Sequence, residues 1–224
     1  MNMTEIGYLA QAIGTILLLG GYTPQIIKLW KTGNPSGIST TFWTMIAMGA
    51  SAIGVNMYLQ GTSIEIVVTQ ALNAILAWYT LYLVYRSQKK YTYHGVRIYE
   101  DSEISPKIKS TFKMIGTFIG LIAVMKLIGI DMRVVGNYVQ LAGTFFLLTA
   151  YIPQISYLYT VKDASGISRW LFIVIGLGLL FVTINMIITG ASTFIIVTEF
   201  VNIALILVQF GLTVHYQNKE LYQH

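Results

Sequence analysis

Long apolar stretches separated by short polar segments make up almost the whole chain. Each stretch has about 20 residues, the length that crosses a hydrocarbon core of about 30 Å as a helix. Seven stretches are found, at residues 5–30, 40–60, 63–86, 111–130, 134–159, 168–189 and 192–216. The pattern therefore predicts an all-α membrane protein with seven transmembrane helices.

The sequence repeats itself at an offset of 129 residues, which is the offset from Pro24 to Pro153. Gly21-Tyr22-Thr23-Pro24-Gln25-Ile26 returns as Ala150-Tyr151-Ile152-Pro153-Gln154-Ile155, and Ser36-Gly37-Ile38-Ser39 returns as Ser165-Gly166-Ile167-Ser168. The same offset carries Gln11 to Gln140, Gly49 to Gly178, Asn56-Met57 to Asn185-Met186, and Asn73 to Asn202. A register that holds without a gap indicates that one three-helix unit is duplicated.

Basic residues concentrate in alternate connecting segments. Lys28 and Lys31 follow the first stretch, seven basic residues lie between the third and fourth, and Lys162 and Arg169 join the fifth to the sixth. The positive-inside rule puts these segments in the cytoplasm, so that the N-terminus lies outside and the C-terminus inside. We expect an integral protein of the cell membrane, and the formal net charge of +5 then requires no nucleic-acid partner.

Two three-helix units in the same orientation need one extra crossing between them. Residues 111–130 have no counterpart in either repeat and supply that crossing. We therefore expect a 3+1+3 arrangement with parallel halves, related by a pseudo-two-fold axis along the membrane normal. The expected parts are a first three-helix repeat over 1–87, a cytoplasmic connector with the linker helix over 88–133, and a second repeat with the C-terminal tail over 134–224.

A Pro-Gln pair lies inside the first apolar stretch of each repeat, as Pro24-Gln25 and Pro153-Gln154. Proline donates no backbone hydrogen bond and crowds the carbonyl four residues earlier. The amide of the following glutamine can donate to a carbonyl freed in this way. Two interpretations stay open: hinges that open and close one end of each half, or static kinks that improve packing. The repetition of the pair favours hinges with a gating role.

Asn73 and Asn202 are polar residues within apolar stretches. Each has a threonine one turn earlier, Thr69 or Thr198, so that each pair lies on one helix face. An amide at membrane depth is costly unless it is satisfied, and it therefore indicates a cavity or a partner helix. A solute site and hydrogen bonds that join helices are both open interpretations.

The two Tyr-x-Pro-Gln-Ile segments, each followed by Ser-Gly-Ile-Ser, resemble the PQ-loop family of membrane transporters. With the expected 3+1+3 layout, the chain looks like the SWEET branch of sugar facilitators, and bacterial SemiSWEETs are similar to one half. The resemblance covers residues 5–216. It implies a carrier that moves a small polar solute, with a sugar as the favoured class, down its gradient by alternating access.

The resemblance also implies a pocket between the halves. SWEET-type carriers place an asparagine of the third helix of each half in the sugar pocket, and Asn73 and Asn202 match that position. The other candidates for this pocket are Asn56, Asn185, Met57, Met186, Thr69 and Thr198. The family's usual pocket tryptophan is absent, and methionine stands at that approximate place. A methionine wall is less specific than a tryptophan face, which weakens the case for a hexose.

The four tryptophans lie toward the ends of the apolar stretches, at positions 30, 43, 78 and 170. Tryptophan is enriched where a helix meets the membrane–water interface. We therefore expect these side chains to anchor the helices at the interface.

Glu199 is the acidic residue that we expect well inside a span, and its counterpart in the first repeat is Gln70. An intramembrane carboxylate is a candidate for proton coupling or for contact with a cationic solute. A structural role, in which a protonated side chain bonds to a neighbouring helix, carries equal weight.

Two alternatives to a facilitative carrier remain. One is a proton-coupled amino-acid transporter similar to cystinosin, with Glu199 as the proton site. The other is a non-transport membrane receptor similar to the KDEL receptor, whose pocket would need clustered basic residues that the spans lack. The three histidines, His94, His215 and His224, are not at metal-ligand spacings, so we expect no enzyme activity, metal or cofactor. Association into a homo-oligomer stays open.

Overall fold

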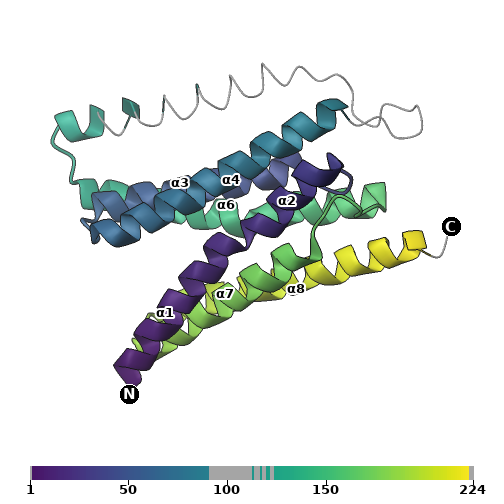
Figure 1. The fold of residues 1–224 in the computed structure, drawn as a ribbon. Helices are drawn as coiled ribbons and strands as arrows, with labels where there is room; N and C mark the ends of the chain where they lie inside the picture. Colours follow the sequence, from purple (N-terminus) through teal and green to yellow (C-terminus); the bar gives the residue numbers. More distant parts are fainter. Residues whose placement is uncertain (1, 91–112, 114–116, 118–119, 122–123, 222–224) are drawn as a thin grey trace.

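The computed structural model describes residues 2–90, 113, 117, 120–121 and 124–221. The described part consists of helices joined by short loops (Figure 1). The helices are α1 (Met3–Gly20), α2 (Tyr22–Thr32), α3 (Thr40–Leu59), α4 (Ile64–Lys90), α6 (Met132–Val161), α7 (Arg169–Ile188) and α8 (Thr193–Leu221). This confirms the predicted all-α class.

Six spans in the described residues are long and apolar enough to cross a membrane. They are Met3–Thr32, Thr40–Leu59, Ile66–Gln88, Met132–Val161, Arg169–Ile188 and Ile195–Lys219. The chain is therefore an integral membrane protein, as the sequence predicts. Nine of the twenty residues of the seventh predicted stretch, 111–130, lie outside the described residues, and the linker helix stays a prediction.

The six spans contact one another in a closed ring. The first span (α1 and α2) packs against α4, α4 against α3, α3 against α6, α6 against α8, α8 against α7, and α7 against the first span again. Within each half, the third helix lies between the first and the second. Between the halves, the first helix of one half packs on the second helix of the other. As a result α4 and α8 lie on opposite sides of the ring (Figure 1).

Matched glycines let the two halves approach closely. A Cβ added to Gly14 of α1 would lie 2.8 Å from the carbonyl oxygen of Gly178 in α7. A Cβ added to Gly143 of α6 would lie 3.1 Å from the carbonyl oxygen of Gly49 in α3. Lipid tails are as apolar as leucine, so close packing at small residues holds such helices together. The repeated glycines thus build the same contact twice.

The loops at 33–39 and 162–168 follow the first span of each half. Gly33 and its counterpart Lys162 end their helices in the left-handed conformation, with φ of 59° and 56°. Ser39 and Ser168 then stand just before α3 and α7. We call the end of the bundle that holds these loops the loop end. The opposite end, which holds the turns between α3 and α4 and between α7 and α8, is the hairpin end.

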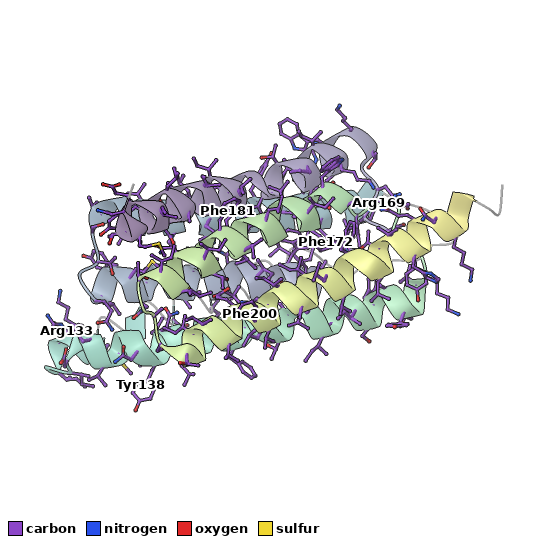
Figure 2. The ribbon with its side chains drawn as sticks, turned by 90° about the horizontal axis from the view of Figure 1, so that it is seen from below. Arg133, Tyr138, Arg169, Phe172, Phe181 and Phe200 are labelled. Atoms are coloured by element: carbon purple, nitrogen blue, oxygen red, sulfur yellow. The ribbon has the colours of Figure 1, made fainter. Side chains whose placement is uncertain are left out.

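Apart from Glu199 of α8, the charged side chains of the described residues lie toward the two ends of the bundle, and Figure 2 shows Arg133 and Arg169 at opposite ends. Between them, large apolar side chains such as Leu72 of α4 and Val201 of α8 are exposed on the outer surface. An apolar belt with charged ends is the surface that a lipid bilayer requires.

The prediction for the tryptophans is wrong at two positions. Trp30 and Trp170 are exposed, but Trp43 is 3% exposed and Trp78 is half-buried, with its Nε1 donating to the hydroxyl of Ser51 at 3.0 Å. A position along a span sets the depth of a side chain, whereas the face that it occupies depends on the neighbouring helix.

Candidate functional site

The motif glutamine of the first half binds the loop of the second half. Gln25 Nε2 donates to the carbonyl oxygen of Gly166 at 3.0 Å, and Gln25 Oε1 accepts from the backbone N–H of Ser168 at 2.8 Å. The glutamine side chain is buried, with 1% of its surface exposed. Both ends of the amide are therefore used in contact with the opposite half.

The motif glutamine of the second half makes the same two bonds in return. Gln154 Nε2 donates to the carbonyl oxygen of Gly37 at 2.5 Å, and Gln154 Oε1 accepts from the backbone N–H of Ser39 at 2.9 Å. We call the two glutamines and the two loops that they bind the glutamine clamp. The clamp joins the halves at the loop end.

The prediction that these amides pair with the carbonyl freed by proline in their own helix is wrong. The N–H at the start of a helix has no intrahelical partner, and at Ser39 and Ser168 that group must be satisfied from outside. Each glutamine reaches across to the N–H of the other half and also satisfies a loop carbonyl. The gating role assigned to Pro24, Pro153 and the glutamines stays a prediction.

The two loops of the clamp also lie directly against each other. The N–H of Gly166 donates to the carbonyl of Ser36 at 3.1 Å, and Asn34 Nδ2 donates to the hydroxyl of Ser165 at 2.8 Å. A Cβ added to Gly166 would lie 2.5 Å from the carbonyl oxygen of Asn34. Only glycine fits this approach, which explains its presence in the repeated motif.

Aromatic side chains fill the interior next to the clamp. Tyr22 and Tyr151 are buried about one turn before the two motif glutamines. The ring centroids of Tyr22 and Trp43 are 6.0 Å apart, and those of Phe42 and Tyr151 are 5.8 Å apart. The loop end is thus closed both by hydrogen bonds and by packed rings.

Asn56 and Asn185 lie at the contacts between the halves. Asn56 Nδ2 donates to Gln140 Oε1 at 2.9 Å, and Asn185 Nδ2 donates to Gln11 Oε1 at 3.0 Å. The two bonds are equivalent under the repeat. Gln11 and Gln140 recur at the repeat offset, so the sequence marks these two glutamines, but the pattern does not show that they bind Asn185 and Asn56.

Asn73 and Asn202 are half-buried on the third helices. Ala77 follows Asn73 by one turn and is fully buried, and Ile206 follows Asn202 by one turn and is 3% exposed. Leu72, next to Asn73, is 47% exposed and marks the outer face. The two asparagines therefore share a face with the interior of the ring, on opposite sides of it. Their contact with a solute stays a prediction.

The remaining pocket candidates are distributed over both halves. The half-buried members are Met57, Met186, Thr69 and Thr198. They lie near the paired asparagines along the sequence, and their role in solute binding likewise stays a prediction.

Glu199 lies on α8 one turn before Asn202. Asn202 Nδ2 donates to Glu199 Oε2 at 3.4 Å, a long hydrogen bond. The acid of the second half is therefore in contact with the asparagine of the proposed pocket.

The halves differ where Glu199 replaces Gln70. In the first half, Gln70 Nε2 donates to the carbonyl of Ala50 in α3 at 2.9 Å. The equivalent carbonyl in the second half, that of Leu179, accepts instead from the hydroxyl of Thr183 at 2.8 Å. Thr183 stands where the first half has a glycine. The hydroxyl thus replaces the amide as donor to that carbonyl, and the carboxyl group of Glu199 is not needed there.

A comparison with family models matches the chain to one described as the PQ loop repeat. The match covers residues 6–66 and 135–195, more than half of the chain, and confirms two copies of the repeat. Proteins with this repeat are typically transporters and not enzymes. A comparison with curated proteins gives no match.

Proposed function

Because the chain belongs to the PQ-loop repeat family of membrane proteins, we propose that it is a carrier that moves a small polar solute by alternating access. The observation that supports this most is the glutamine clamp. Its bonds run between the halves, so they can break and form again while each half keeps its own helices. A seal of this kind at one end of a two-fold bundle is what an inner gate requires.

The proposed solute site lies between the halves, on the hairpin side of the aromatic layer. Asn73 and Asn202 are its main contacts, because an amide offers the donors and acceptors that hydroxyl groups need. The two threonines and two methionines named above line the same region. Asn56 and Asn185 support the pocket from the contacts between the halves.

A sugar moving down its gradient is the first solute class that we propose, as in SWEET-type carriers. A second class, an amino acid moved together with a proton, is favoured by Glu199. That carboxyl group accepts a long hydrogen bond from Asn202. In the first half Gln70 donates to a carbonyl of the second helix, and in the second half Thr183 makes the equivalent bond in place of Glu199. We further propose the cell membrane as the location, with the loop end in the cytoplasm.

Uptake into vesicles tests the proposal. The purified protein is reconstituted into liposomes and offered labelled sugars and amino acids, with and without an imposed pH gradient. A transported solute should enter faster than into protein-free vesicles and should raise the melting temperature of the protein, because a bound solute stabilises the folded state. A protein that moves none of these solutes and is stabilised by none is not such a carrier.

A further inference from the structure

Two polar side chains are buried inside the second half without a hydrogen-bond partner. Gln209 and Thr213 lie one turn apart on α8, and each is 0% exposed. Among the described residues, the Gln209 amide nitrogen, the Gln209 amide oxygen and the Thr213 hydroxyl have no hydrogen-bond partner. Three polar groups therefore meet at one place in the interior.

The first half shows that the fold does not need these groups. The counterparts of Gln209 and Thr213 are Thr80 and Val84, which are also 0% exposed. The Thr80 hydroxyl donates to the carbonyl of its own helix at Leu76 at 2.8 Å, and valine has no polar side-chain atom. The one polar side chain at this place in the first half is thus paired, whereas the two in the second half are not.

A buried amide that finds no partner costs several kcal/mol, so natural structures satisfy it with protein or water. A buried water typically makes about three hydrogen bonds to such groups. The Gln209 amide nitrogen, the Gln209 amide oxygen and the Thr213 hydroxyl together provide that number. Water supplies the donor and the acceptors that these unpaired groups require.

From this pair the polar face of α8 continues toward the loop end, whereas in the other direction residues 203–208 are apolar and the next polar residue on the same face is Asn202, two turns before Gln209. Glu199 precedes Gln209 by ten residues, which corresponds to roughly 15 Å along a helix. Toward the loop end, Gln217 follows Thr213 by one turn, and its amide donates to the carbonyls of Ala164 and Ile167 in the loop at 162–168, both at 2.7 Å. The pair lies between the buried acid and the loop end.

We propose that Gln209 and Thr213 hold buried water that forms part of a proton path between the loop end and Glu199. A proton that enters there neutralises the Glu199 carboxylate, and the same proton leaves when the carrier opens to the other side. Among the described residues, the ionisable side chains toward the loop end of the path include Arg169 of α7, which donates to Gln217 and Asn218, and, on α8 itself, His215 and the buried Tyr216, whose ring packs against Tyr159 of α6. This inference rests on the proposed function and specifies its proton-coupled form.

The double variant Gln209→Thr, Thr213→Val tests the path with residues that already pack in the first half. Uptake driven by a pH gradient should fall at least about tenfold, because the loss of a proton-transfer step slows a reaction by at least that factor. Exchange of solute at equal pH moves no net proton and should keep its wild-type rate. Thr80→Val, the matched change in the first half, should leave both rates unchanged.

Other outcomes overturn the inference. An equal loss of driven uptake and of exchange would assign the pair to solute binding or folding. Two results would refute the proton path and leave the carrier function intact. One is a double variant whose uptake driven by a pH gradient equals that of the wild type. The other is wild-type uptake that does not depend on the pH gradient.

Hydration is measured separately, by water-edited solid-state NMR of protein in lipid with nitrogen-15 in glutamine side chains. The Gln209 amide should receive magnetisation from water readily, whereas Gln25, equally buried but paired, should not. The Gln209→Leu variant assigns the signal. A dry Gln209 overturns the inference whatever the transport result, while a wet Gln209 in a protein that moves no solute refutes the proposed function instead.

Discussion

Single amide side chains join the two halves, and the two motif glutamines each use both their donor and their acceptor. Gln25 and Gln154 exchange bonds with loops of the opposite half, and Asn56 and Asn185 pair with glutamines across the helix contacts. In a medium without water such bonds are specific, because an unpaired partner costs several kcal/mol. The residues of the family motif thus act on the loop of the other repeat.

Lys162 has a left-handed backbone conformation, which glycine has at the same position of the other repeat. Its φ is 56°, and its counterpart Gly33 has a φ of 59°. A left-handed backbone costs a residue with a side chain about 1 kcal/mol, so Lys162→Gly should stabilise the protein by about that amount. Denaturant unfolding in detergent measures the change. Gly33→Lys is the reverse control, and a stabilisation by that variant would contradict the argument.

At the scale of elements, the ring is closed by two helix contacts that depend on matched glycines. Gly14→Ala would place a Cβ 2.8 Å from the backbone of Gly178, so α1 and α7 must move apart. We expect a destabilisation of about 1–3 kcal/mol, the usual cost of overpacking. A melting curve of the purified protein shows it. Gly20→Ala in the same helix meets no atom within 4 Å and should not destabilise; if it does so equally, the contact is not the cause.

The two first spans carry the same proline in different settings. In the first half α1 ends at Gly20 and α2 begins at Tyr22, with Gly21 between them in the helical conformation, whereas in the second half the single helix α6 runs on through Pro153. If Pro24 is a hinge, Pro24→Ala should lower the transport rate more than it lowers solute affinity. Kinetic uptake measurements separate the two quantities. A variant that loses affinity and keeps its maximal rate would instead favour a static kink.

At the scale of the whole molecule, the ring places α4 and α8 on opposite sides, and with them the paired asparagines. Asn73→Ala and Asn202→Ala should each abolish uptake while the protein stays folded in the membrane, because each removes one side of the proposed pocket. Vesicle uptake and size-exclusion chromatography check the two parts of this prediction. Normal flux in both variants would refute the pocket.

The sequence predicts the all-α membrane fold, the two repeats and six of the spans, because hydrophobic length and a constant offset are both local patterns. It does not predict the clamp. Gln25 and Gly166 are 141 residues apart, and nothing in the pattern states which loop the amide reaches. The buried position of Trp43 fails for the same reason, since periodicity gives a face but not the neighbour that covers it. The polar pair in α8 is visible as a departure from the repeat only once its burial is known.

The exchange of Gln70 for Glu199, together with the threonine that compensates for it, also bears on the origin of the chain. In an assembly of two identical subunits every substitution appears twice, so an acid introduced into one would face its own copy. Fusing both units into one polypeptide lifts that constraint and lets each evolve alone. In this chain one half has a neutral amide and the other an ionisable group at the same position, which gives a symmetric scaffold a chemically one-sided interior.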